Sequence, residues 1–204
     1  MSQARGSSRS WVKSESKSRS RLRTWGALLA LALAAGCGGP GSTPGPKQVR
    51  LPGLGFAVPE AWETRAPQTS MRIAEFMLPE SNEQATLVIF RFQGGGGTAD
   101  ANVARWISQF RQPNGGPSGD VAKVTSSTRE SLTLTQLDVR GSYEAQAMPG
   151  APPTPALPDA RLLALVVEGS GDPYYFKLLG PTPVIDRWEP AWVELVASLA
   201  PNAE

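Results

Sequence analysis

The sequence predicts one α+β domain, with a central antiparallel sheet of six or seven strands and helices packed against it. Three observations lead to this fold class. Short segments rich in β-branched and aromatic residues follow one another, mostly at hairpin spacing, between residues 49 and 200. Two segments, Ala99–Gln112 and Pro183–Leu199, carry apolar residues at helical spacing. The segment Ala85–Phe92 is apolar on both faces, which indicates a sheet covered on both sides.

Three strands are predicted in the first half of this domain. The first, Leu54–Val58, ends at a turn formed by Pro59–Trp62, and Trp62 is expected to be buried at the end of that strand. The second strand, Ser70–Leu78, stops at a proline and a polar loop. The third is the two-sided apolar segment Ala85–Phe92.

A helix is predicted at Ala99–Gln112, directly after a run of glycines. Thr98 is the expected N-cap, and Asp100 suits the positive end of the helix dipole. The apolar residues of this segment follow helical spacing and are Val103, Trp106, Ile107 and Phe110. We therefore expect the helix to pack against the sheet.

Two hairpins are predicted in the second half of the domain. The strands Val121–Thr128 and Ser131–Tyr143 form the first hairpin, and Arg161–Gly169 and Pro173–Leu179 form the second. Between the hairpins lies Met148–Asp159, whose five prolines predict an excursion without regular structure.

A terminal helix is predicted at Pro183–Leu199. Pro190 lies in its middle and lacks the N–H of a helical hydrogen bond, so a kink or a restart is expected there. The buried stripe of this helix is expected to consist of Ile185, Trp188, Trp192, Leu195, Val196 and Leu199.

Residues 1–36 have the parts of an export signal. Three arginines at positions 19, 21 and 23 precede the apolar run Ala27–Ala35, and small residues follow it. A membrane-spanning helix needs about 20 apolar residues, so this run is too short to span a bilayer. We interpret residues 1–36 as a signal peptide.

The sequence Ala34-Ala35-Gly36-Cys37 resembles the lipobox of bacterial lipoproteins. The resemblance implies that the Cys37 thiol receives a diacylglycerol, that the chain is cut before it and that the new amino terminus is acylated. Ala34 departs from the pattern, which usually has leucine there. Cys37 is the only cysteine, so it forms no intramolecular disulfide. The alternative is a small buried cysteine at the end of an ordinary signal peptide or of a poorly hydrophobic anchor.

The rest of the chain is expected to be a tether followed by one domain. Residues 37–48 are rich in Gly and Pro and predict a disordered tether, and residues 49–200 predict a single globular domain. The part after residue 36 carries 13 of the 20 basic and 17 of the 18 acidic residues, a net charge of about −4. A mildly acidic chain without a basic cluster argues against nucleic-acid binding.

The chain contains no histidine. Its absence removes imidazole as a metal ligand and as the commonest general base. With Cys37 acylated, serine–histidine and cysteine–histidine hydrolases are excluded, as are zinc sites of the usual kind. A carboxylate metal site or a serine–lysine pair stays open, but no cofactor or metal is predicted.

Both ends of the domain resemble PsbP-like domains. Gly55–Trp62 resembles their opening strand and turn, and Tyr174–Pro181 with the helix after it resembles their last strand and helix. The resemblance covers about residues 50–200 and is one of pattern. It implies an α/β/α sandwich with a central antiparallel sheet and a non-catalytic accessory or partner-binding role. It carries over no site residues.

The segment Gly94–Ala99 matches the dinucleotide-loop pattern G-x-G-x-x-A between a strand and a helix, and Asp120 follows about 20 residues later. In such a loop, backbone N–H groups hold a pyrophosphate. A flexible strand-to-helix loop is the favoured interpretation, because four consecutive glycines match many patterns. The following strands also form hairpins rather than a parallel βαβ unit.

Three further features have a functional and a plainer interpretation. The loop Met148–Asp159 is either a partner-binding surface or, as favoured, a tolerated insertion. Four aromatic residues line a ligand pocket or, as favoured, fill the core: Trp62, Trp106, Trp188 and Trp192. A cluster of acidic residues either supplies a catalytic pair of carboxylates or, as favoured, consists of solvated loop charges: Glu60, Glu63, Glu75, Glu80 and Glu83.

These observations leave three hypotheses about function. The favoured one is a lipid-anchored envelope protein that binds a protein partner or steadies a complex without chemistry of its own. The second is a small-molecule or lipid carrier with a cavity between the sheet and the helices. The third is a hydrolase built from carboxylates, Ser and Lys. Gly38, rather than Asp, follows the lipidated cysteine, which favours the outer membrane facing the periplasm.

Overall fold

The computed structural model describes residues 45–82, 84–145 and 156–202. The predicted signal peptide, Cys37 and most of the tether lie outside these residues. The elements in chain order are β1 (Lys47–Leu51), β2 (Leu54–Val58), β3 (Glu63–Arg65), β4 (Arg72–Met77), β5 (Thr86–Arg91), α1 (Ala99–Ile107), β6 (Phe110–Arg111), a 3₁₀ turn (Ser118–Asp120), β7 (Lys123–Arg129), β8 (Leu132–Tyr143), β9 (Leu157–Glu168), β10 (Tyr174–Pro181), α2 (Thr182–Ser198) and β11 (Ala200–Pro201).

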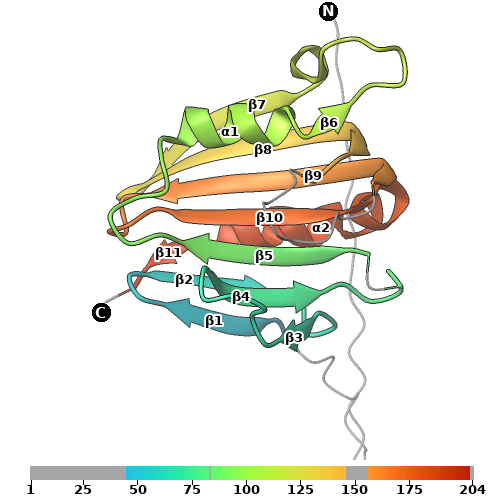
Figure 1. Ribbon diagram of the computed structural model, residues 1–204. Coiled ribbons are helices and arrows are strands. Elements are labelled where there is room, and N and C mark those ends of the chain that lie inside the picture. Colours follow the sequence, from blue (N-terminus) through green and yellow to red (C-terminus); the bar gives the residue numbers. More distant parts are fainter. Residues whose placement is uncertain (1–44, 83, 146–155, 203–204) are drawn as a thin grey trace, which may run out of the picture. The chain divides into compact units, whose positions relative to one another are not determined.

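A large antiparallel sheet forms the centre of the domain (Figure 1). Within the described residues this sheet has eight strands. Seven of them follow the order β3-β4-β5-β10-β9-β8-β6, and the eighth, β7, pairs with β8. A second sheet has three strands in the order β1-β2-β11. Helix α1 lies over one face of the large sheet and α2 lies over the other (Figure 1). The predicted α+β class with a central antiparallel sheet is confirmed.

Two apolar cores lie on opposite faces of the large sheet. The core on the α2 face includes Phe176 and Leu178 of β10, and it also contains Trp62, which is completely buried. The core on the α1 face includes Tyr175 of β10 and Trp106 of α1. Successive strand residues point to opposite faces, so one strand contributes to both cores. The prediction of a sheet covered on both sides is thereby confirmed.

Several predicted boundaries differ from the structure. Strand β1 begins at Lys47, two residues before the predicted start of the domain, and pairs with β2. Strand β9 begins at Leu157, so the last residues of the predicted irregular excursion Met148–Asp159 belong to a strand that pairs with β8. In both places, pairing with a partner strand outweighs a local composition rich in Pro, Gly or polar residues.

The first helix is shorter than predicted. It ends at Ile107, and Phe110 begins β6 by pairing with Tyr143 of β8. Phe110 is still buried on the α1 face of the sheet. Phe110 continues the helical spacing of apolar residues, although its backbone belongs to a strand. The spacing of apolar residues alone cannot distinguish these two cases. Thr98 is the N-cap as predicted, since its hydroxyl accepts the N–H of Ala101.

Helix α2 continues through Pro190 without a restart. Proline removes the hydrogen bond that a backbone N–H would give to the carbonyl of Asp186. The side chains of Asp186 and Glu189, just before the proline, both bind Arg161 of β9. These ion pairs attach the helix to the sheet where its own hydrogen bonding is weakest. Among the residues described, no helix is long and apolar enough to cross a membrane.

Candidate functional site

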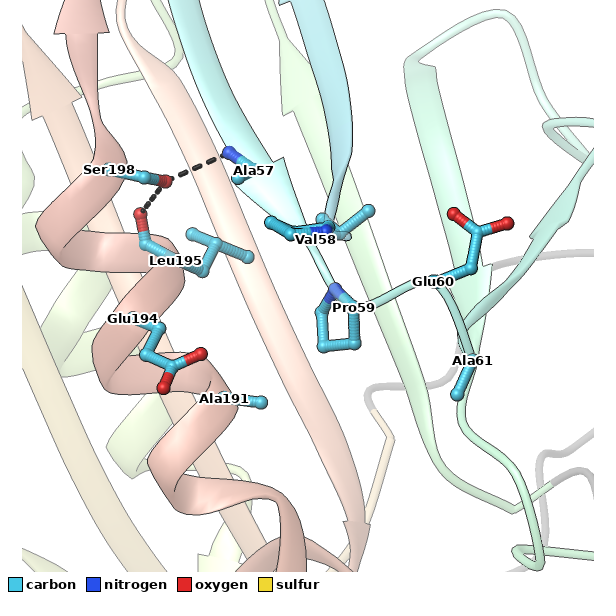
Figure 2. Close-up of a pocket in the computed structure, with 10 residues that line it drawn as sticks. Ala57, Val58, Pro59, Glu60, Ala61, Ala191, Glu194, Leu195 and Ser198 are labelled. Atoms are coloured by element: carbon cyan, nitrogen blue, oxygen red, sulfur yellow. Dashed lines mark hydrogen bonds between the residues drawn. The ribbon is translucent and has the colours of Figure 1, made fainter. Parts of the chain in front are cut away.

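An apolar groove of about 660 Å³ lies between the end of β2 and helix α2 (Figure 2). We call it the α2 groove. One wall comes from the segment before β1, the end of β2 and the turn after it, and consists of Pro46, Ala57, Val58, Pro59, Glu60 and Ala61. The other wall is one side of α2, formed by Ala191, Glu194, Leu195 and Ser198.

The walls of the α2 groove are held together by hydrogen bonds through Ser198. The backbone N–H of Ala57 donates to Ser198 Oγ at 2.8 Å, and that hydroxyl donates to the carbonyl of Leu195 at 2.7 Å (Figure 2). Val58 and Leu195 extend from the groove into the core and are almost fully buried. Strand and helix are thus attached to each other directly beside the groove, which indicates a preformed hollow.

Among the described residues, Glu60 and Glu194 are the only charged ones that line the α2 groove. Both are exposed, and neither forms an ion pair with any residue that the structure describes. The groove therefore combines an apolar floor with an acidic rim. Such a surface favours a binding partner that is apolar in the middle and basic at its edges.

A second hollow, of about 290 Å³, lies on the opposite face of the sheet, beside α1. We call it the Lys177 pocket. It is lined by side chains of β5, β8, β10 and α1 and by residues next to these elements: Phe90, Phe92, Asn102, Arg105, Trp106, Gln109, Tyr143, Ala145, Tyr175 and Lys177. Five of these residues are aromatic, so an apolar wall surrounds a small number of polar groups.

Lys177 lies on the face of β10 that also carries the buried Tyr175. Its Nζ is 5.9 Å from the centre of the Trp106 ring and 5.8 Å from that of Tyr143, and it donates to Gln109 Oε1 at 3.4 Å. Burial, with smaller contributions from the charges of Arg105 and Arg72, lowers the pKa of Lys177 to about 8. No carboxylate in the described ranges forms an ion pair with this ammonium group.

The glycine loop before α1 (Gly94–Gly97) is hydrogen-bonded to residues that line the Lys177 pocket. The amide of Asn102 donates to the carbonyls of Gly96 and Thr98 at 2.9 and 3.0 Å, and its oxygen accepts from Arg105 Nη2 at 2.5 Å. The Tyr175 hydroxyl accepts the N–H of Gly96 and donates to the carbonyl of Gly97. Asn102 therefore orients the loop and the Arg105 guanidinium together.

This geometry does not fit the dinucleotide interpretation of Gly94–Ala99. The N–H groups of Gly94, Gly95 and Gly96 donate to Asp172, to the carbonyl of Phe92 and to the Tyr175 hydroxyl, respectively. They are thus not directed at a phosphate. Local packing explains the glycine at position 96 instead, since a Cβ there would lie 2.5 Å from the Phe92 ring.

Three carboxylates converge on Arg161, whose side chain is almost completely buried on the α2 face. Its guanidinium binds Asp138 at 2.8 Å and Asp186 and Glu189 at 2.7 Å. The hydrogen bond with Asp138 contributes most to raising the pKa of Arg161. We call this group the Arg161 cluster.

The Arg161 cluster lowers the pKa values of two carboxyls. Burial acts to raise the pKa of Asp186, but hydrogen bonds from Arg140 and Arg161 outweigh it and the net pKa is lowered. The hydrogen bond from Arg161 lowers the pKa of Glu189. The carboxylates are already compensated by arginine, so the cluster fixes α2 to the sheet rather than presenting an acid–base pair. In the described part of the chain, no three Asp, Glu, His or Cys side chains are placed so that they could hold a metal ion.

The structure separates the residues that the sequence grouped together. Of the tryptophans, Trp62 and Trp192 are buried in the α2-face core, Trp188 packs against that core, and Trp106 lines the Lys177 pocket. The acidic residues also have different environments. Glu60 lines the α2 groove, whereas Glu63, Glu75 and Glu80 form ion pairs with Arg65, Arg72 and Arg187.

One acidic residue differs from the favoured interpretation as a solvated loop charge. Glu75 is 3% exposed, lies within β4 and pairs with Arg72 at 2.9 Å, because its position in the alternating strand points inward. Cys37, Glu83 and residues 148–155 of the proline-rich excursion lie outside the described residues. Lys177 was not singled out from the sequence, where it is one charged residue in an otherwise apolar strand.

The chain matches no protein-family model and no curated protein. It is similar to the solution structure of cyanobacterial PsbP (CyanoP) from Synechocystis sp. PCC 6803, with a TM-score of 0.50 and 13% sequence identity over 81% of this chain and 99% of that one. A crystal structure of PA94 from Pseudomonas aeruginosa, a protein of unknown function named as a putative regulator, has a TM-score of 0.42 and 19% identity over 78% and 99% of the two chains. The likeness to CyanoP establishes a PsbP-like fold and extends to the fold alone.

Proposed function

We propose that this chain is a lipid-anchored protein of the bacterial cell envelope that binds a partner protein and performs no chemistry of its own. The observation that carries the proposal is the α2 groove, which is apolar along its floor and has two carboxylates without ion-pair partners among the described residues at its rim. A preformed apolar hollow of this kind is typical of a binding site.

The charges at the groove favour one kind of partner. Glu60 and Glu194 stand on opposite walls (Figure 2). A partner segment with an apolar side chain in the middle and Lys or Arg on either side would fill the apolar groove and pair with both carboxylates at once. Opposite charges at the edge of an interface guide association and select the correct partner, while the apolar contact supplies most of the affinity.

The anchor supports the same proposal. The lipobox resemblance at Cys37, after an export signal, favours a lipid-anchored protein on the periplasmic side of the outer membrane. Nine residues run from Gly38 to Pro46, and Pro46 lines the α2 groove. Even fully extended, nine residues span only about 30 Å. The groove would therefore remain close to the membrane surface, which favours a partner that is itself attached to the envelope.

The carrier hypothesis requires a cavity between the sheet and a helix, and the Lys177 pocket has that position. Its volume of about 290 Å³ lies just below the range of about 300–1,000 Å³ that is usual for ligand pockets. A small polar ligand suits this volume better than a lipid. The Lys177 pocket is thus the specific observation that favours a carrier or sensor as the second candidate function.

Site-specific photo-crosslinking in living bacteria tests the partner proposal. A photoreactive amino acid replaces Ala61, which is exposed on a wall of the α2 groove. The expected result is one discrete adduct that weakens when Glu60 and Glu194 are changed to Lys. It also weakens in Cys37→Ser, which should leave the membrane fraction and lack acyl chains by intact mass.

The matched control carries the photoreactive residue at Val193, which is 59% exposed on α2 and does not line the groove. No adduct is expected from this position. Equal adducts from Ala61 and Val193, or an adduct insensitive to the two charge reversals, would contradict binding in the groove. An unacylated Cys37 would contradict the lipid anchor and leave the groove result interpretable.

A further inference from the structure

The Lys177 pocket contains positive charge that the protein itself does not neutralise. Lys177 and Arg105 both line it, and neither forms an ion pair with a described carboxylate. Their hydrogen-bond acceptors among the described residues are neutral: Gln109 Oε1 for Lys177 and Asn102 Oδ1 for Arg105. Partial removal of an ammonium group from water without a counter-ion is unfavourable. The pocket is thus arranged to attract an anion from outside.

The position of the ammonium group is set by its surroundings. Lys177 pairs in the sheet with Val88 on one side and with the small Ala164 on the other, which leaves space above β10 on the α1 face. The rings of Trp106 and Tyr143 lie within cation–π distance of Nζ. These contacts hold the charge inside the pocket. Within the described ranges, Gln109 is the only hydrogen-bond acceptor of Nζ, so its other N–H groups are available to a ligand.

Arg105 is oriented rather than free. Its guanidinium donates to Asn102, whose amide is fully committed to the carbonyls of Gly96 and Thr98. Asn102 is 2% exposed, so this arrangement is part of the folded core. Lys177 is therefore the half-buried cation of the pocket and Arg105 the exposed one, and Asn102 links Arg105 to the loop at Gly96.

The rest of the lining is suited to an apolar body. The rings of Phe90 and Phe92 are nearly parallel, with centres 6.3 Å apart, and the Tyr175 ring lies 5.7 Å from that of Phe92. Flat groups pack well against such surfaces. The volume of about 290 Å³ limits the ligand to a small molecule. Two cations without a backbone N–H cradle match one singly charged head group better than a polyphosphate.

We propose that the Lys177 pocket binds a small organic carboxylate, with its carboxylate between Lys177 and Arg105 and its aromatic or short aliphatic body against Phe90 and Phe92. The site is separate from the α2 groove, because it lies on the other face of the large sheet. The inference does not depend on the lipid anchor or on the proposed protein partner. It assigns a ligand class to the second candidate function.

Isothermal titration calorimetry with the purified full chain tests this assignment. The probes are benzoate, phenylacetate and hexanoate, with neutral benzamide and inorganic phosphate as comparisons. At least one carboxylate is expected to bind about tenfold more tightly than benzamide and phosphate. Lys177→Met should weaken that binding by at least about tenfold, and Arg105→Gln, at the exposed rim, by roughly threefold or more. Lys123→Met removes an exposed lysine of β7 outside this pocket and should leave it unchanged.

Three results would overturn the proposal. The first is an absence of binding by all three carboxylates. The second is equal binding of benzamide or phosphate, which would mean that either the charge or the apolar wall contributes nothing. The third is carboxylate binding that survives in both Lys177→Met and Arg105→Gln. Arg105 lies on the helix surface, so its variant keeps the test valid even if Lys177→Met alters the fold.

Discussion

Two basic side chains lie on opposite faces of the large sheet, and their surroundings differ sharply. Arg161 of β9 faces α2 and binds three carboxylates within 2.8 Å. Lys177 of β10, the neighbouring strand, faces the α1 side and has no carboxylate partner among the described residues. Arg161 is compensated and holds the fold together, whereas Lys177 is uncompensated and available to a ligand. The difference between structural and functional charge lies in what surrounds each cation.

The largest effect is expected from Arg161→Met. This change leaves Asp138, Asp186 and Glu189 without the cation that they share, and it detaches α2 near Pro190. Breaking a buried ion pair costs about 3–5 kcal/mol, and these carboxylates are 25–46% exposed, so about 3 kcal/mol is expected. The free energy of unfolding in urea measures it. Arg187→Met, which breaks an exposed pair with Glu80, should cost under about 1 kcal/mol. Equal losses of stability in both variants would show that the buried Arg161 cluster contributes no more than an exposed ion pair.

The same cluster gives the protein an acid-dependent stability. The pKa values of Asp186 and Glu189 are lowered from 3.8 and 4.5 in the folded state. Their contribution is present above those values and is lost as pH falls through the lowered folded pKa values. The free energy of unfolding should thus fall below about pH 4 in the natural protein and fall less steeply in Arg161→Met. Urea titrations between pH 2.5 and 6 measure how the free energy of unfolding depends on pH in both proteins. Parallel curves would contradict a stabilising role of Arg161 for the ionised Asp186 and Glu189.

Lys177→Met is expected to have the opposite sign, raising the free energy of unfolding at pH 7 by about 1–2 kcal/mol. The pKa of Lys177 is lowered from 10.5 to about 8, so its charged form is disfavoured in the folded state. The unfolded chain then binds more protons between these pH values, and stability rises with pH over this interval. The gain from Lys177→Met should shrink as pH rises from 8 to 10.5. Thermal or urea unfolding at several pH values measures it, and a loss of stability at pH 7 would show that the charge is compensated.

Gly96→Ala is expected to have a moderate effect on the Lys177 side of the molecule. An added Cβ would lie 2.5 Å from the Phe92 ring and 3.0 Å from Tyr175, so the rings must shift. A cost of about 1 kcal/mol is expected, since the nearest atoms belong to a side chain that can move. Carboxylate binding should weaken as well. Gly119→Ala, where no atom lies within 4 Å, provides the control in urea unfolding; equal stabilities of the two variants would contradict close packing at the loop.

The sequence predicted the elements that depend on local pattern and missed those that depend on distant partners. The strand Leu54–Val58 and the Thr98 cap were predicted correctly, because alternation and capping are local signals. Strand β11 was not predicted, since Ala200 pairs with Gly55 far away in the chain. The contrast between Arg161 and Lys177 was also missed. A charge in an alternating strand looks solvent-facing until the helix that covers that face, and the charges on that helix, are known.

The smallest effect is expected from Arg140→Gln. Arg140 binds Asp186 at 2.9 Å, but both side chains are nearly half exposed, and Asp186 keeps its bond to the buried Arg161. A cost of about 0.5 kcal/mol is therefore expected in urea unfolding. In the Arg161→Met background, Arg140 is the one cation that still pairs with Asp186 among the described residues, so the same change should cost more. A double-mutant cycle measures this coupling. Strictly additive losses would mean that the two arginines act independently. The small cost of losing Arg140 would then not be explained by the carboxylate that it shares with Arg161.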